Sequence, residues 1–505
     1  MLPLTITFGV VALFSNGVRA SLLWVSTRVS FAVGSNLSNE IYRRTLYQPY
    51  DVHLARNSSE VINGISTKVG EVIFYILIPT LNLISAGAML IAMLFVLLFI
   101  VPGIALVIFV GFGIAYLFLI GLARNKLKLY SEHIARESTN VIRFLQEGLG
   151  GIRDILIDGS QEFFCANYRD ADQKLRRAQG GNQFVGISPR YGMEAMAMLF
   201  ISTLAYVLAK QPGGVGVAIP MLAAIALCMQ RLLPALQQVY GAWSTIHGAQ
   251  ISLQDALKLL DQPLPIHVGQ SSSLQLPFQQ YIELNKISFR FNPKARWVLK
   301  DVSLKIYKGA RVGFIGSTGS GKSTLLDIIM GLLQPIEGTL AIDGQLIAPA
   351  NCRSWQVHIA HVPQVIFIAD SNIEENIAFG IPKDQIDRER VRQVSRQAQI
   401  ADVIESWPEQ YQTRVGERGV QLSGGQRQRI GIARALYKHV DVLIFDESTN
   451  ALDSETELAV MRAIDTLSLD LTVLIIAHRL STLKNCTQIF EIAHGTIQEK
   501  KFPLQ

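Results

Sequence analysis

The longest uncharged stretch of the chain runs from Val72 to Ala123 and contains no Asp, Glu, Lys, Arg or His. As a single α-helix it would be roughly 78 Å long, because each residue adds about 1.5 Å. The hydrocarbon core of a bilayer is only about 30 Å thick, so the stretch predicts two membrane crossings. Pro102 and Gly103 suit the turn between them. Buried helices of a soluble protein are the alternative, and the length of the uncharged stretch argues against it.

Basic residues orient these two crossings. Arg124, Lys126 and Lys128 follow the second one, whereas the Pro102–Gly103 turn carries no charge. The positive-inside rule therefore places the outer ends in the cytoplasm and the turn on the other side. A nucleic-acid surface is the alternative explanation for the net charge of +6. Basic residues beside apolar segments are more typical of a membrane edge, so we expect no nucleic-acid partner.

Three further crossings are predicted. A second pair lies between Met196 and Leu233 and is interrupted by Lys210-Gln-Pro-Gly-Gly. The first 24 residues form a fifth candidate that contains Arg19. A signal peptide is the alternative for this segment, but it lacks a basic start and a clear cleavage site.

The remaining chain defines the domain organisation. Residues 125–190 have a polar, helical pattern, which predicts cytoplasmic extensions of two membrane helices joined by a short turn. Residues 47–59 predict a similar cytoplasmic turn. We therefore assign residues 1–260 to a transmembrane domain, 261–280 to a linker rich in Pro, Ser and Gln, and 281–505 to a soluble α/β domain. The four scattered cysteines form no CxxC pair and suggest neither zinc nor disulfides.

A phosphate-binding loop opens the α/β domain. Gly316-x-x-x-x-Gly321-Lys322-Ser323 follows an apolar strand and precedes an apolar helix, which is the context of a P-loop rather than of a flexible linker. The glycines let backbone N–H groups surround phosphates, Lys322 neutralises the β and γ oxygens, and Ser323 offers its hydroxyl to Mg²⁺. ATP and Mg²⁺ are the predicted cofactors. The predicted nucleotide-binding residues here are Gly316, Ser317, Thr318, Gly319, Ser320, Gly321, Lys322, Ser323 and Thr324.

Two acidic residues end a later apolar strand. Asp446 and Glu447 follow "DVLIF", and in open α/β sheets ligands bind at the carboxyl ends of the strands. Asp446 suits Mg²⁺, a hard cation that prefers oxygen ligands. Glu447 is then placed to polarise the attacking water. A helix-capping acid is the alternative role for either residue.

A second glycine motif opens a predicted helix. Ser423-Gly424-Gly425-Gln426 has the features of a helix N-terminus that binds an anion. One domain would then contain two phosphate-binding motifs.

Residues from about 281 to 497 resemble the nucleotide-binding domain of ABC transporters, since "LSGGQ" matches that family's signature and stands in order with the P-loop and the acidic strand. The resemblance implies that Ser423 and Gly425 face the γ-phosphate bound by a second subunit, and that Gly424 and Gln426 are also nucleotide-binding residues. With one P-loop and one signature, the chain needs a partner, and a homodimer is the simplest one. The resemblance also implies three catalytic or coupling positions and one stacking position: Gln364 contacts Mg²⁺ and the water, His478 senses the γ-phosphate, Asp453 couples the two sites, and Phe291 stacks on adenine where Tyr is usual.

Residues 1–260 resemble the membrane domain of ABC exporters, and "LGGIRDILIDGSQEFF" and "SPRYGMEAM" resemble bacterial flippases for lipid-linked oligosaccharides. The expected fold is an α-helical transmembrane domain of about five spans followed by an α/β P-loop NTPase domain. Exporters of this type usually have six spans, so the first span is expected to be missing. Arg190 and Glu194 are placed to meet a polar head group or to form a structural ion pair.

The resemblance implies ATP-driven export or flipping of an amphipathic substrate by an inner-membrane protein with its ATPase in the cytoplasm. The alternative is a regulatory module that gates a partner without turnover. The presence of Glu447, Gln364 and His478 argues for hydrolysis.

Overall fold

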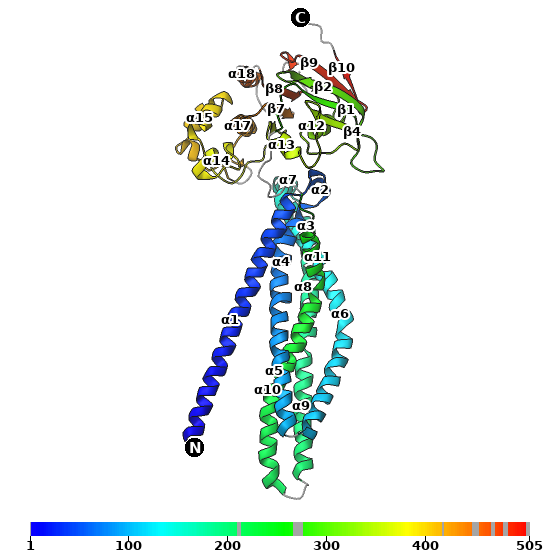
Figure 1. Ribbon diagram of the computed structural model, residues 1–505, viewed down its shortest axis with the longest axis vertical. Helices are drawn as coiled ribbons and strands as arrows, with labels where there is room; N and C mark the ends of the chain where they lie inside the picture. Colours follow the sequence, from blue (N-terminus) through cyan, green and yellow to red (C-terminus); the bar gives the residue numbers. More distant parts are fainter. Residues whose placement is uncertain are drawn as a thin grey trace. The chain divides into compact units, whose positions relative to one another are not determined.

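The computed structural model describes residues 2–100, 102–209, 214–265, 276–416, 419–446, 454–465, 470–477 and 483–500. The chain divides into two compact units, of which the first comprises residues 1–48 and 52–264 and the second comprises residues 49–51 and 265–505. Among its described residues the first unit contains helices and no strand, whereas the second combines helices with two β-sheets (Figure 1).

The N-terminal half of the chain is built from long helices and short connecting ones. In chain order they are α1 (Leu2–Leu46), α2 (Tyr50–Ala55), α3 (Ser58–Asn63), the π-helix η1 (Gly64–Lys68), α4 (Val69–Val72), the π-helix η2 (Ile73–Leu77), α5 (Ile78–Ile100), α6 (Pro102–Gly150), α7 (Ile152–Asp158), α8 (Gln161–Ile187), α9 (Pro189–Ala209), α10 (Gly214–Gly248) and α11 (Gln250–Leu260).

Three segments of the described chain are long and apolar enough to cross a membrane by length and composition: Thr5–Leu46, Ser58–Phe99 and Phe109–Gly150. The predicted break within the uncharged stretch is confirmed, because α5 ends at Ile100 and α6 begins at Pro102. Proline suits the first turn of a helix, where its missing N–H costs no hydrogen bond. α9 and α10 lie at the second predicted pair, and the total of five spans stays a prediction.

The helices of the predicted crossings pack around a common apolar cluster. Its buried members come from α5, α6, α9 and α10: Leu97, Phe112, Tyr116, Met193, Ala197, Ile225, Met229, Leu232, Leu233 and Tyr240. α1 diverges from these helices towards its N-terminus (Figure 1), and its apolar side chains, such as Phe8 and Leu13, are exposed. In a membrane this surface would face lipid or another subunit.

The predicted helical extensions are confirmed, because α6 runs on past Asn125 to Gly150 and α8 leads to α9, which begins at Pro189. Their position in the cytoplasm stays a prediction. The sequence predicted only a short turn between them, but the structure has a seven-residue helix, α7. Gly159 ends α7 with φ of 65°, a left-handed conformation that glycine adopts without steric cost.

The second unit contains two sheets. Four antiparallel strands follow the order β2-β1-β4-β5, and six strands follow the order β10-β9-β3-β8-β7-β6, in which only β10 is antiparallel to its neighbour. The strands are β1 (Tyr281–Phe289), β2 (Leu299–Tyr307), β3 (Arg311–Ile315), β4 (Glu337–Ile342), β5 (Gln345–Leu346), β6 (Ile359–Val362), β7 (Val442–Asp446), β8 (Thr472–Ile476), β9 (Gln488–Ala493) and β10 (Thr496–Glu499).

The helices of this unit pack into two hydrophobic clusters. α12 packs with the antiparallel sheet in one cluster, and α14–α17 pack against the other face of the parallel sheet in the second. The helices are α12 (Lys322–Ile329), α13 (Cys352–Gln356), α14 (Ile373–Ile377), the 3₁₀ turn η3 (Lys383–Gln385), α15 (Arg388–Gln397), α16 (Ala401–Glu405), the 3₁₀ turn η4 (Gln410–Gln412), α17 (Gly424–Tyr437) and α18 (Ser454–Asp465).

Candidate nucleotide site

The predicted phosphate-binding loop lies between the central strand β3 and α12. Gly316 has φ of 147°, and a Cβ atom there would lie 2.3 Å from the carbonyl oxygen of Ile492. Gly321 has φ of 104° and a Cβ would lie 2.9 Å from the carbonyl oxygen of Val298. Both positions therefore require glycine, which lets the backbone fold tightly enough to turn its N–H groups inward.

Lys322 is the first residue of α12, and it is 5% exposed. Its ammonium group donates to the carbonyl oxygens of Gly316 and Ser317 at 2.9 and 3.0 Å. The positive charge is thus held inside the loop, at the helix end whose dipole also attracts anions. The arrangement suits a phosphate group.

The order β3-β8-β7 of parallel strands brings the second predicted motif to the same edge. Ile476 at the end of β8 pairs with Phe314 on one side and with Asp446 on the other. Ser323 Oγ donates a hydrogen bond to Asp446 Oδ1 at 3.3 Å. A hydroxyl and a carboxylate are oxygen ligands of the kind that Mg²⁺ prefers, and this ion usually adds phosphate oxygens and waters as further ligands. The two residues therefore fit a magnesium ion.

Asp327 is an acidic residue near this site that was not predicted from the sequence. It stands four residues after Ser323 on α12, a spacing that places both side chains on one face of the helix. This spacing could have predicted that Asp327 lies near the site. Burial, and then the nearby Asp446 carboxylate, raise the pKa of Asp327 to about 6.

Two further predicted residues lie in loops around this edge. Gln364 follows β6, whose last residue Val362 pairs with Phe445 of β7, so the loop with Gln364 starts beside Asp446. Phe291 follows β1 and is 58% exposed, with its ring against Phe289 at a centroid distance of 5.0 Å. An exposed ring held on its edge by a second ring presents a face on which a base can stack.

The signature motif begins α17. The Ser423 hydroxyl accepts a hydrogen bond from the backbone N–H of Gln426 at 3.2 Å, while the Gln426 side chain accepts one from the Ser423 N–H at 2.8 Å. This capping box fixes the helix start. Gly424 and Gly425 form the first turn. The P-loop helix and the signature helix pack into different hydrophobic clusters.

Three predicted residues, Glu447, Asp453 and His478, lie outside the described residues. Among the described residues the structure therefore brings together the P-loop, Asp446 and the loop with Gln364.

Residues 2–209 match the family model of the ABC transporter transmembrane region, and residues 299–450 match the family model described as ABC transporter. The chain belongs to the ABC transporter family. Its relatives include the ATP-dependent lipid A-core flippase of Cupriavidus metallidurans, with 27% identity over 94% of this chain and 80% of the relative. The putative multidrug export ATP-binding/permease protein YgaD of Bacillus subtilis is 28% identical over 94% of this chain and 81% of the relative.

Among solved structures, this ABC transporter is similar to a bacterial Atm1-family ABC exporter with ATP bound. The TM-score is 0.81, the sequence identity is 25%, and the match covers 94% of this chain and 82% of the exporter. The fusion of one membrane region to one ATP-binding domain makes the chain a half-transporter and an integral membrane protein. This ABC transporter couples ATP hydrolysis to the export of a lipid or amphipathic substrate.

Proposed function

We propose that two copies of this chain flip a lipid with a phosphorylated or saccharide head group across a bacterial inner membrane, with the ATP-binding domains in the cytoplasm. The observation that carries the dimer is the presence of one P-loop and one signature helix, which pack into separate hydrophobic clusters. A head-to-tail pair of such domains would complete two composite sites. The lipid class is supported by relatives named lipid A-core flippases.

In this proposal the P-loop residues from Gly316 to Thr324 hold the phosphates of ATP. Ser323, Asp446 and Gln364 hold Mg²⁺, which would neutralise charge on the β and γ oxygens. Glu447 accepts the proton of the attacking water, and His478 contacts the γ-phosphate. Phe291 stacks on adenine and Asp453 couples the two sites. Ser423 and Gly425 contact the γ-phosphate bound by the other copy, and Gly424 and Gln426 complete this part of the nucleotide site.

The membrane unit offers a polar contact for the head group. Arg190 at the start of α9 pairs with Glu194 at 2.7 Å, and the Gln237 side chain of α10 donates to the same carboxylate oxygen at 3.4 Å. The Arg190 side chain is 58% exposed, so it retains donors for an anionic group. We propose Arg190 as a head-group contact and residues 261–280 as the linker to the ATP-binding domain.

The test measures Mg²⁺-dependent ATP hydrolysis by the purified full-length protein in nanodiscs. Lipid A, a polyprenyl-linked saccharide and phosphatidylethanolamine are compared, and native mass spectrometry measures the oligomer. We expect a dimer that is stimulated several-fold by one of the first two lipids and not by phosphatidylethanolamine. Equal stimulation by all three, or none, would contradict the proposed substrate class, and a monomer with full turnover would contradict the dimer.

Two arginine variants locate the head-group contact. Arg190→Ala should raise the lipid concentration needed for half-maximal stimulation and leave unstimulated hydrolysis unchanged. Arg176→Ala is the matched control, because Arg176 also forms an i,i+4 ion pair, with Asp172, but on α8 outside the predicted crossings. Equal effects of the two substitutions would remove Arg190 from the proposal.

A further inference from the structure

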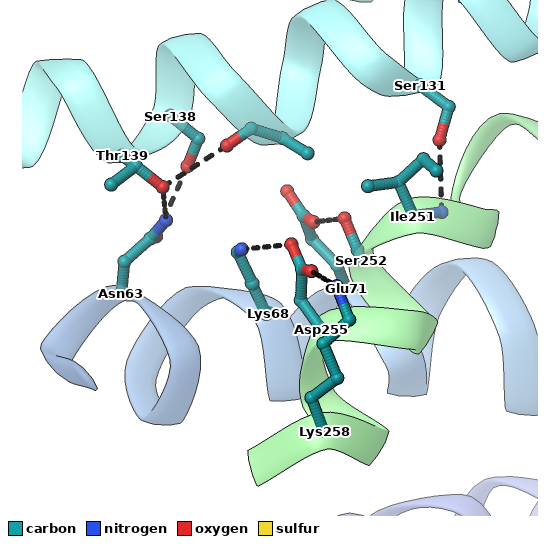
Figure 2. Close-up of polar contacts among 11 residues, drawn as sticks. Asn63, Lys68, Glu71, Ser131, Ser138, Thr139, Ile251, Ser252, Asp255 and Lys258 are labelled. Carbon is teal, nitrogen blue, oxygen red and sulfur yellow. Dashed lines mark hydrogen bonds and ion pairs between the residues drawn. The ribbon is translucent and has the colours of Figure 1, made fainter. Parts of the chain in front are cut away.

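A cluster of buried polar side chains joins three parts of the membrane unit (Figure 2). Its members come from the α3–η1–α4 segment, from α6 and from α11. The central contact is an ion pair between Lys68 Nζ and Asp255 Oδ2 at 2.5 Å. The Lys68 side chain is 7% exposed and that of Asp255 is 25% exposed. A second contact lies beside it, in which Ser252 Oγ donates to Glu71 Oε2 at 2.5 Å.

The same segment is also bound to α6. Asn63 is fully buried, donates to Thr139 Oγ1 at 3.0 Å and accepts a hydrogen bond from Ser138 Oγ at 3.2 Å. On the other side, the backbone N–H of Ile251 at the start of α11 donates to Ser131 Oγ of α6 at 3.2 Å. α11 is thus held by side chains of two different helices, and polar contacts of this kind specify one arrangement more strictly than apolar packing does.

The charged positions lie at the end of one π-helical turn and between it and a second. Lys68 is the last residue of η1, Glu71 lies in the four-residue α4, and η2 begins at Ile73. π turns inside α-helices are rare and occur frequently at functional positions. If a π turn relaxed to α-helix, the helix would change register by one residue, and the side chains on one side of the turn would rotate by about 100° about the helix axis. Lys68 would then leave Asp255, so the ion pair holds the segment in this register.

Close backbone packing supports the same contact. Gly64 in η1 lies so near α11 that a Cβ atom would be 2.3 Å from Leu259 Cδ1. An apolar cluster that includes Val69, Val72 and Ala256 adjoins the ion pair. The charged contact is therefore seated in a packed interface, where breaking one partner leaves an uncompensated buried charge.

The position of α11 in the chain gives this interface its significance. α11 ends at Leu260, and the main stretch of the second unit, which holds the ATP-binding domain, begins at Pro265. Arg44 at the end of α1 donates to the carbonyl oxygens of Leu260 and Gln262 at 2.7 and 3.1 Å, which also ties down the end of α11. Any force passed along this covalent connection between the ATP-binding domain and the membrane helices must cross α11.

We infer that Lys68 and Asp255, supported by Glu71 and Ser252, are positioning residues that hold α11 against η1 and α4 and thereby couple ATP hydrolysis to substrate movement. Through the ion pair between Lys68 and Asp255, motion of the ATP-binding domain reaches the helical segment that continues into the membrane as η2 and α5. The inference rests on coupled export, and depends neither on the identity of the lipid nor on a homodimer.

The test compares Lys68→Asp, Asp255→Lys and the double exchange in full-length protein in proteoliposomes. Hydrolysis and the movement of a fluorescent lipid are measured together, with whichever of the three lipids above the wild type moves fastest. We expect each single variant to move the fluorescent lipid at least about tenfold more slowly than the wild type. The rate of ATP hydrolysis in vesicles without this substrate lipid should stay within about twofold of the wild type. The double exchange should recover at least half of the movement.

Lys258→Asp is the matched control, because Lys258 contacts the same Asp255 at 3.3 Å but is 76% exposed. It should behave as the wild type. If Lys68→Asp does not assemble, Lys68→Met replaces it, since this substitution removes the charge and keeps the length of the side chain. The inference is overturned by a proportional loss of hydrolysis and movement, by failure of the double exchange to recover movement, or by an equal effect of Lys258→Asp.

Discussion

Ser323 and Asp446 lie 123 residues apart in the sequence, yet the Ser323 hydroxyl donates a hydrogen bond to the Asp446 carboxylate at 3.3 Å. The contact joins the first turn of α12 to the end of β7. It arises because β3 and β7 flank β8 in parallel, so that the loops leaving their carboxyl ends meet at one edge of the sheet.

This contact predicts the effect of Asp446→Asn. The amide removes the negative ligand proposed for Mg²⁺, and hydrolysis should fall at least about 100-fold, since a metal ion supplies several kcal/mol of charge stabilisation. Steady-state hydrolysis against Mg²⁺ concentration measures it. Asp441→Asn, just before the opposite end of the same strand, is the control and should retain most turnover. Unchanged hydrolysis in Asp446→Asn would remove Asp446 from the metal site.

Glu447→Gln should abolish steady-state hydrolysis, with a loss of roughly 100-fold or more, because an amide can hold the water but cannot accept its proton. ATP binding should survive, as measured with a fluorescent nucleotide. Glu455→Gln, an exposed acid in the first turn of α18, is the matched control. Wild-type turnover in the Glu447 variant would refute its assignment as the base.

Ser423→Arg should block hydrolysis by filling the γ-phosphate position of the other subunit's site. Mixing it with Lys322→Ala should restore one intact composite site in each mixed dimer. Hydrolysis of the mixture, with dimer formation followed by two affinity tags, measures the rescue. If mixed dimers form and stay inactive, then either the signature acts within its own chain or both sites must act together.

His361 predicts a loss of stability in acid. Burial lowers the pKa of this β6 histidine to about 4 from 6.5, and its Nε2 atom is buried. The unfolded chain therefore binds the proton first, so stability is complete above pH 6.5 and falls as the pH drops towards 4. The expected loss is about 2 kcal/mol at pH 5.

Hydrogen exchange of the β6 and β7 amides at pH 7 and pH 5 in the full-length protein measures this loss. His361→Leu should remove most of the pH dependence, and His439→Leu, at an exposed position, is the control. A pH dependence that persists in His361→Leu would assign the effect to another group.

The orientation of α1 can be tested by cysteine labelling. Arg43 and Arg44 lie in its last turn, so the positive-inside rule places this end in the cytoplasm and the N-terminal end outside. In a variant without the four native cysteines, Thr5→Cys should react with a membrane-impermeant maleimide added to intact cells. Tyr47→Cys, just after the helix, should react only after the cells are opened. The reverse pattern would contradict the predicted orientation.

Much of the fold could be predicted because its signals are local. The uncharged stretch, the helix break at Pro102 and the strand–loop–helix around Lys322 each depend on consecutive residues, and the structure confirms them. The helix α7 and the π turns were not predicted. Two glycines beside α7 favour a turn over a helix, so the sequence pattern predicted only a turn there. A π turn breaks the 3.6-residue period on which helix prediction rests.

The sequence by itself determined that this chain has a membrane half and an ATP-binding half, because hydrophobic length and phosphate-loop spacing are properties of neighbouring residues. Only the tertiary structure decided that Lys68 pairs with Asp255, 187 residues away. It also decided that burial, and then the nearby Asp446 carboxylate, raise the pKa of Asp327 to about 6. Such pairings depend on the rotation of each helix about its axis and on which strands are neighbours. The sequence alone does not identify the partner of a charged residue. The partner is set when the chain packs, because packing excludes water and brings one opposite charge within contact distance.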